Sequence, residues 1–231
     1  MLGDMEWQAL RLSAWVGVWS TLLCLLPGVW LGWLLARKEF HGKSALEALV
    51  FMPMVLPPTV PGYLLLVLFG TQGVIGKWLH EHWGVQLVFN WKGAVLAAAV
   101  VAFPFMVQAS KIAVKMVDSR LENAARTLGS GPLKTWFTVT LPLSLPGILA
   151  GSLMVFSRSL GEFGATITFV GNVQGETRTL PLAIYSAINQ VNGDMAALRL
   201  VVISLCFAFF SLLLSNMLTS RAEKRLGVHH A

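Results

Sequence analysis

One pair of charged side chains in the apolar part of this sequence could act on an ion. Arg158 and Glu162 lie four residues apart at the end of the apolar segment 141–160. On a helix this spacing brings both side chains to one face, and an interfacial ion pair contributes only about 0–1 kcal/mol to stability. The alternative is that Arg158 provides positive potential for an anion in transit, while Gly161 and Gly164 let the backbone bend as a gate.

Other motifs for chemistry are incomplete. The stretch HGKS (41–44) ends like a phosphate-binding loop, but Arg37 occupies the position of its first glycine. The sequence has no GxSxG, HExxH or CxxC motif, and Cys24 and Cys206 lie in apolar segments without metal-ligand spacing. We therefore expect no catalytic residue, no metal site and no enzymatic activity in this chain itself.

The composition is that of an integral membrane protein. Hydrophobic residues make up 55% of the 231 residues and charged residues only 12%, against about 25% charged residues in soluble domains. We predict an all-α fold in one domain, residues 1–231, without an internal repeat. Five segments approach the roughly 20 apolar residues that a membrane span requires: about 13–36, 48–69, 93–110, 141–160 and 200–218.

The basic residues predict the orientation of these spans. Eleven of the 17 lysines and arginines fall in three stretches that five spans place on one side, and basic loops are typical of the cytoplasmic side. The N-terminus is then outside and the C-terminus cytoplasmic. Because these cations are spread over three loops rather than gathered in one patch, we expect no binding of nucleic acid. They are Arg37, Lys38, Lys43, Lys111, Lys115, Arg120, Arg126, Lys134, Arg221, Lys224 and Arg225.

The second span is rich in proline. Pro57 and Pro58 stand near its middle, and each proline removes a backbone donor, so we expect this helix to bend or open there. The bend either lines a transport pathway as part of a gate or is a static kink that improves packing. We also predict short helices along the outer interface, one in 70–90 and one over 179–190, outside the membrane core.

A charged stretch, ENAARTLGSGPLKTWFTVTLP (122–142), separates the third and fourth spans. Ser119 and Glu122 have the spacing of a capping box, which predicts a short helix over about 120–129 with Gly129 just after its end. Apolar residues at helical spacing make one stripe on this helix, which indicates a surface that packs against a partner. These residues are Leu121, Ala124, Ala125 and Leu128.

A second helix is expected to begin at Pro132 and to enter the fourth span. Leu141, Pro142 and Pro146 should bend it where it reaches the membrane. Force applied to the short helix would then pass to the span through the turn Gly129–Gly131.

The pattern E-A-A-x-x-x-G, followed by about eleven residues and L-P, resembles the cytoplasmic signature of binding-protein-dependent ABC-importer permeases. Asn123, Ala124, Ala125, Gly129, Leu141 and Pro142 stand in its places, with asparagine where the family has glutamate. The resemblance implies the type I ABC-importer permease fold, with a coupling helix between spans 3 and 4. In that family the coupling helix inserts into a cleft of an ATP-hydrolysing subunit, whose closure drives the spans between inward-facing and outward-facing states.

Several stretches narrow the resemblance to permeases of molybdate importers, among them PMVLPPTVPGYLLLVLFG and SRSLGEFGATITFVGNVQGETRTLPLAIY. The near alternatives are sulfate/thiosulfate and tungstate permeases, and a secondary transporter is a more distant one. The resemblance implies a multi-pass permease homodimer in the bacterial inner membrane, two ATP-binding subunits that hold ATP and Mg²⁺, and an extracytoplasmic molybdate-binding protein. That protein would dock on the outer loops 70–90 and 161–199, and no cofactor is expected in this chain.

Overall fold

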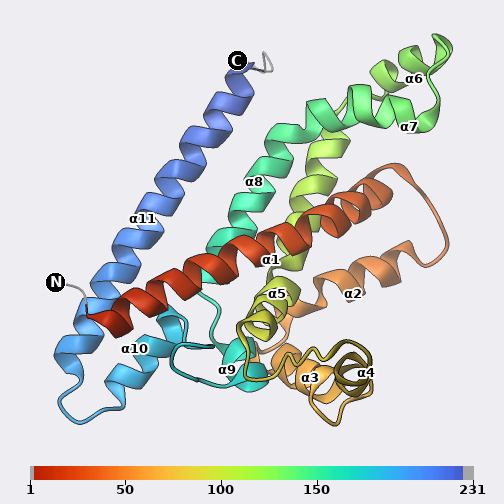
Figure 1. The fold of residues 1–231 in the computed structure, drawn as a ribbon. Coiled ribbons are helices and arrows are strands. Elements are labelled where there is room, and N and C mark those ends of the chain that lie inside the picture. The colour runs from red at the N-terminus through yellow and green to blue at the C-terminus, as the bar shows by residue number, and fades with distance from the viewer. Residues whose placement is uncertain (1–2, 226–231) are drawn as a thin grey trace.

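The computed structural model describes residues 3–225, and every regular element in that part of the chain is a helix, which confirms the predicted all-α fold. Figure 1 shows these helices in an elongated bundle with shorter helices at both ends. In chain order they are α1 (Asp4–Arg37), α2 (Lys43–Val55), α3 (Thr59–Phe69), α4 (Val74–Trp83), α5 (Trp91–Met116), α6 (Ser119–Thr127), α7 (Pro132–Thr135), the π-helical turn η1 (Trp136–Thr140), α8 (Leu141–Leu160), α9 (Gly164–Val170), α10 (Leu180–Ile188) and α11 (Asp194–Arg225).

Four helical segments of the described chain are long and apolar enough to cross a membrane: Asp4–Arg37, Trp91–Met116, Pro132–Leu160 and Asp194–Leu214. A fifth span results if α2 and α3 count together, although the two helices meet at an angle of 111°. Most helices extend beyond the apolar segments from which we predicted them, because their ends carry polar residues that continue the helix. The predicted segment 141–160 coincides with α8.

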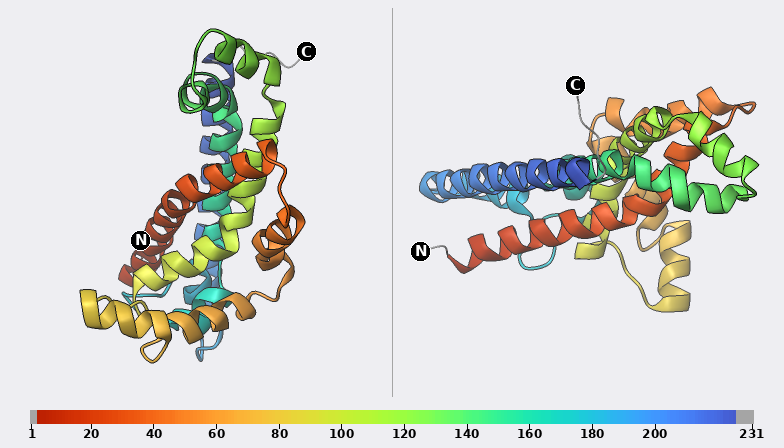
Figure 2. Two further views of the ribbon diagram at one scale, coloured as in Figure 1. Left: turned by 90° about the vertical axis from the view of Figure 1, so that its right-hand side faces the viewer. Right: turned by 90° about the horizontal axis from the view of Figure 1, so that it is seen from above.

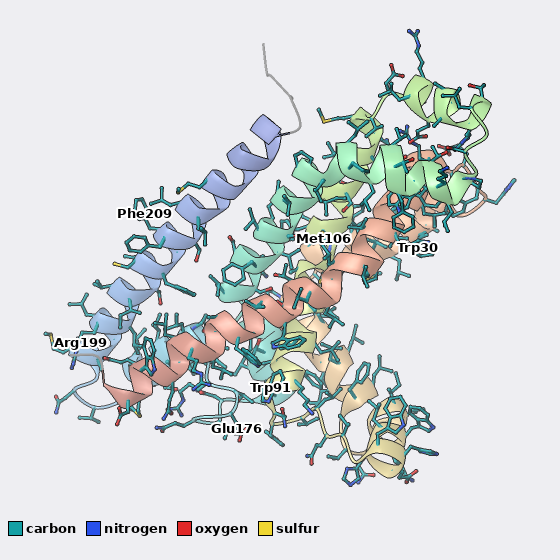
Figure 3. All side chains as sticks on the ribbon, turned by 45° about the horizontal axis from the view of Figure 1, so that its top comes forward. Trp30, Trp91, Met106, Glu176, Arg199 and Phe209 are labelled. Atoms are coloured by element: carbon teal, nitrogen blue, oxygen red, sulfur yellow. The ribbon has the colours of Figure 1, made fainter. Side chains whose placement is uncertain are left out.

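The bundle is centred on α1, α5 and α8, which pack against one another along their lengths. The buried side of α1 carries many small residues, including Ser13, Gly17, Ser20, Cys24, Gly28 and Gly32. In lipid, helices gain little from the hydrophobic effect on contact, so small residues that allow close approach hold them together. Met106 of α5 is fully buried opposite Gly28, and Figure 3 shows it among the central helices, while the exposed Phe209 of α11 projects away from them.

The shorter helices gather at opposite ends of the bundle (Figures 1 and 2). One end holds α6, α7, the loop after α1 and the last turns of α11, so the three basic stretches of the sequence share it. The other end holds α4, α9 and α10, which accounts for the two short helices predicted within 70–90 and over 179–190. The fold thus has one basic end, with α6 at its tip.

The glycine contact between α1 and α5 can be tested by adding a side chain. A Cβ atom on Gly32 would lie 2.6 Å from Ser110 Cβ and 2.9 Å from the backbone at Val107 and Lys111. We expect Gly32→Leu to cost about 1–3 kcal/mol, the usual range for overpacking, and to lower the midpoint of thermal unfolding in detergent. Val18→Leu, which enlarges a side chain on the exposed side of the same helix, serves as the control. Equal midpoints for the two variants would contradict this packing.

Candidate functional site

The short helix α6 begins differently from the prediction. Its N-terminal cap is Asp118, whose Oδ1 accepts a hydrogen bond of 2.8 Å from the backbone N–H of Arg120. Ser119 is already the first helical residue, and the carboxylate of Glu122 points elsewhere. The predicted capping box of Ser119 and Glu122 is therefore wrong, because the preceding aspartate takes the capping position.

The C-terminal end of α6 forms as predicted. Gly129 has a φ of +85°, a backbone conformation that glycine adopts without strain. The N–H of Gly129 donates to Arg126 O at 2.9 Å, and the N–H of Ser130 donates to Ala125 O at 3.0 Å. These two bonds make a Schellman motif, which ends the helix and reverses the chain toward α7.

Most of the apolar stripe of α6 is exposed in the described chain. Leu121 is 50% exposed and Leu128 is 87% exposed; Ala124 is also exposed and Ala125 is half-buried. Gly129 is exposed, and a Cβ atom on it would meet nothing within 4 Å. Asn123, at the family's glutamate position, is exposed as well. The tip of the basic end thus presents an exposed apolar surface.

Glu122 is the buried side chain of α6, with only 6% of its surface exposed. Its Oε1 lies 2.9 Å from Nη2 of Arg37, the last residue of α1, and accepts a hydrogen bond of 2.8 Å from Oγ1 of Thr140. Nη2 of Arg37 also donates to Val117 O at 2.8 Å, in the turn that leads into α6. This junction could not be predicted from local spacing, because its two charged members are 85 residues apart.

The chain enters the fourth span through η1, a wide turn in an otherwise continuous helix from Pro132 to Leu160. The N–H of Leu141 donates to Trp136 O, five residues earlier instead of four. Pro142 has no N–H to donate and its ring crowds the preceding turn, so a wider turn before it relieves both effects. Leu141 and Pro142 therefore lie where the helix changes direction between α7 and α8 (Figure 1).

The second span breaks at Pro57 and Pro58, as expected from its prolines. The break brings Pro58 against α9, where a Cβ atom on Gly164 would lie 2.6 Å from Pro58 Cβ. A Cβ on Gly62 of α3 would likewise lie 2.6 Å from Ala165 O. Only glycine permits these contacts, so two predicted gate residues, Pro58 and Gly164, meet in one close crossing of α3 and α9.

The predicted ion pair forms next to this crossing. Nη1 of Arg158 lies 2.8 Å from Oε2 of Glu162, whose other oxygen accepts the backbone N–H of Ala165 at 2.8 Å. Glu162 is 3% exposed, whereas the side chain of Arg158 remains 31% exposed. Gly161 is exposed, and a Cβ atom on it would meet only Arg158 O, at 4.0 Å. The carboxylate thus has both its partners within the chain, while part of the Arg158 side chain stays exposed and could meet an anion.

In the part of the chain that the structure describes, no three His, Cys, Asp or Glu side chains come together as a group that could hold a metal ion.

Comparison with known proteins places these features in a family. Residues 28–224 match the family described as "Binding-protein-dependent transport system inner membrane component". The chain is 50% identical to the molybdenum transport system permease protein ModB of Escherichia coli K12, over 98% of this chain and 99% of that protein. It is also 50% identical to ModB of Haemophilus influenzae, over 96% and 97%. Identity to the sulfate transport system permease protein CysW of Synechococcus elongatus is 34%, over 99% and 79%.

Solved structures share the fold at low sequence identity. A chain of the bacterial alginate ABC transporter, solved in complex with an alginate pentasaccharide-bound periplasmic protein, superposes with a TM-score of 0.75 at 15% identity, covering 99% of this chain and 82% of that one. A chain of the inward-facing MetNI methionine ABC transporter gives 0.68 at 15% identity, covering 94% of each. The fold is therefore that of ABC-importer permeases, and the chain belongs to the family of binding-protein-dependent transport system inner membrane components.

Proposed function

We propose that this chain is the membrane-spanning permease subunit of a molybdate importer, in which ATP hydrolysis in a separate subunit moves the oxyanion into the cytoplasm. The observation that supports coupling to a separate ATP-hydrolysing subunit is the exposed apolar stripe of α6 at the basic end of the bundle. For the substrate, the support is 50% identity to molybdenum transport permeases over nearly the whole chain, against 34% to a sulfate permease.

The coupling surface consists of the small exposed helix and the turn after it. Ala124 and Ala125 let a partner surface approach the helix closely, and Leu121 and Leu128 offer apolar contacts at its two ends. A short helix with an exposed apolar face is the form of ligand that a hydrophobic groove takes up. The ATP-binding subunit would supply this groove and would hold ATP and Mg²⁺, so the permease needs neither catalytic residue nor cofactor. Displacement of α6 would pass through η1, Leu141 and Pro142 into α8.

The proposed assembly contains two permeases, two ATP-binding subunits and one extracytoplasmic molybdate-binding protein. The binding protein would dock on the outer loops 70–90 and 161–199, at the end of the bundle opposite α6. The pathway would run between the two permeases, past the partly exposed side chain of Arg158 and the contact between Pro58 and Gly164. Pro57 and Gly161 would flank that contact as parts of the gate. Substrate selection would rest mainly with the binding protein, because Arg158 is the one basic residue within the apolar segment 141–160.

The substrate assignment is tested by competition. In vesicles that contain the complete complex, we expect unlabelled molybdate or tungstate to suppress the uptake of labelled molybdate. A hundredfold excess of sulfate should not suppress it. This excess corresponds to roughly 3 kcal/mol of difference in binding free energy between the two anions. Suppression by equimolar sulfate would instead support the sulfate permease alternative. The companion binding protein, measured alone by calorimetry with the same anions, should rank them in the same order.

The coupling assignment is tested by placing a charge on the docking helix. We expect Ala125→Asp and Gly129→Asp to reduce molybdate uptake at least about tenfold, since a buried unpaired carboxylate costs several kcal/mol. The ATP-binding subunit should co-purify poorly with these variants or hydrolyse ATP without transport. His41→Asp, which adds the same charge to an exposed loop at the same end, is the matched control. Normal co-purification and normal uptake in both α6 variants would refute the assignment.

The role of Arg158 is tested with a variant pair. Arg158→Ala should slow uptake at least about tenfold, the lower range of effects from a focused field on a charged substrate, without loss of assembly. Since this change also leaves Glu162 without its counterion, we compare it with Arg158→Ala/Glu162→Gln, which removes both charges. If Arg158 acts on the anion, the double variant stays slow. Recovery of uptake in the double variant, or unchanged uptake in Arg158→Ala at saturating binding protein, would reduce Arg158 to a structural ion pair.

A further inference from the structure

A single carboxylate oxygen holds α6 to two membrane helices. Oε1 of Glu122 receives both the guanidinium of Arg37, at the end of α1, and the hydroxyl of Thr140, at the end of η1. Arg37 in turn holds the carbonyl of Val117 in the turn before α6. The end of α1, the start of α6 and the start of α8 therefore converge on one buried group.

A buried glutamate at position 122 costs free energy of desolvation that an apolar side chain filling the same space would not. A buried ion pair often stabilises a protein no more than apolar side chains of the same volume would, because both charges lose their hydration. The ion pair does, however, fix the relative position of the elements that it joins, because each hydrogen bond forms only within a narrow range of distance and angle. Within Ser119–Thr127 the other side chains are exposed or half-buried, so Glu122 is the point at which α6 is anchored.

The covalent connection from α6 to α8 is a weaker route for movement. It passes through Gly129, Ser130 and Gly131, and the two glycines have open space around their Cα atoms. A segment of this kind can change its backbone angles without moving the helix after it. The junction at Glu122 bypasses this turn and reaches α8 at Thr140, directly before Leu141 and Pro142.

We infer that Glu122 is a positioning residue that carries displacement of α6 to α1 through Arg37 and to α8 through Thr140. The inference rests on the proposed function of α6 as the docking helix. It assigns α1 a part in the movement, since the carboxylate joins α1 and α8 to the same helix. Loss of the junction would leave the ATP-binding subunit docked while its movement reaches the spans less completely.

The test measures the number of molybdate ions moved per ATP hydrolysed, in vesicles that contain the complete complex and saturating binding protein. We expect Glu122→Gln and Thr140→Val to co-purify with the ATP-binding subunit and to hydrolyse ATP. Each should lower the transport ratio at least about fivefold, the lower end of typical coupling between sites. Thr140→Ser, which keeps the hydroxyl, should retain the ratio. So should Glu39→Gln, which neutralises an exposed carboxylate whose ion pair with Lys43 lies on the surface.

Two results would overturn the inference. One is an unchanged ratio in Glu122→Gln, whether transport and hydrolysis both stay normal or both fall in proportion. The other is loss of the ATP-binding subunit from both Glu122→Gln and Thr140→Val, which would mean that the junction only supports folding or docking. Ala125→Asp separates the inference from the proposed function. If Ala125→Asp disrupts docking while Glu122→Gln transports normally, only the inference fails; if Ala125→Asp has no effect, the proposed function of α6 fails first.

Discussion

Within a bilayer, every backbone N–H and C=O must find its partner inside the protein, and the rest of this structure depends on that constraint. The described spans are helices, which satisfy these groups internally. Two departures from the regular helix lie at or directly before prolines. At Pro57 and Pro58 the chain breaks, yet Leu56 N–H still donates to Met52 O and Val60 N–H to Pro57 O. Before Pro142 the helix widens into η1 and continues.

These departures coincide with the features to which we assign function. The break in the second span creates the close crossing with α9, beside the ion pair of Arg158 and Glu162. The wide turn η1 ends at Thr140, which binds Glu122. Several charged side chains also have partners inside the protein. Arg37 pairs with Glu122, Lys111 lies 2.7 Å from Glu47, and Arg158 pairs with Glu162. Each of these three ion pairs connects two helices or stabilises the end of one.

Hydropathy and local spacing predicted much of the fold. The all-α class, the short helices at both ends, the break at Pro57 and Pro58 and the positive φ of Gly129 could all be predicted, because each depends on residues close in sequence. Interactions between distant residues could not. The spacing of Ser119 and Glu122 indicated a capping box, but Glu122 binds Arg37, a residue on another helix, and Asp118 caps α6 instead. The 111° angle between α2 and α3 could not be predicted either, because α2 packs against α5 and α3 packs against α9.

For the docking surface, too, the sequence predicts the local pattern but not the contacts between distant residues. Periodicity predicted the stripe of Leu121, Ala124, Ala125 and Leu128, and the structure leaves most of it exposed. Periodicity alone could not tell a stripe that packs within the chain from one that awaits another protein. Periodicity also could not predict that Glu122 anchors the helix, because the burial of Glu122 depends on contacts with the ends of α1 and η1.

Site-specific photo-crosslinking can show whether α6 docks on an ATP-hydrolysing subunit. A photoreactive amino acid at Asn123, an exposed position on α6, is activated in native membranes, the chain is purified, and the linked peptide is identified by mass spectrometry. We expect a crosslink from Asn123 to a nucleotide-binding subunit that co-purifies in equal amount. We expect no such crosslink from the same group placed at Leu26, on the exposed side of α1. Recovery of the chain without a nucleotide-binding protein, or crosslinks from Asn123 only to lipid, would contradict the docking of α6 on such a subunit.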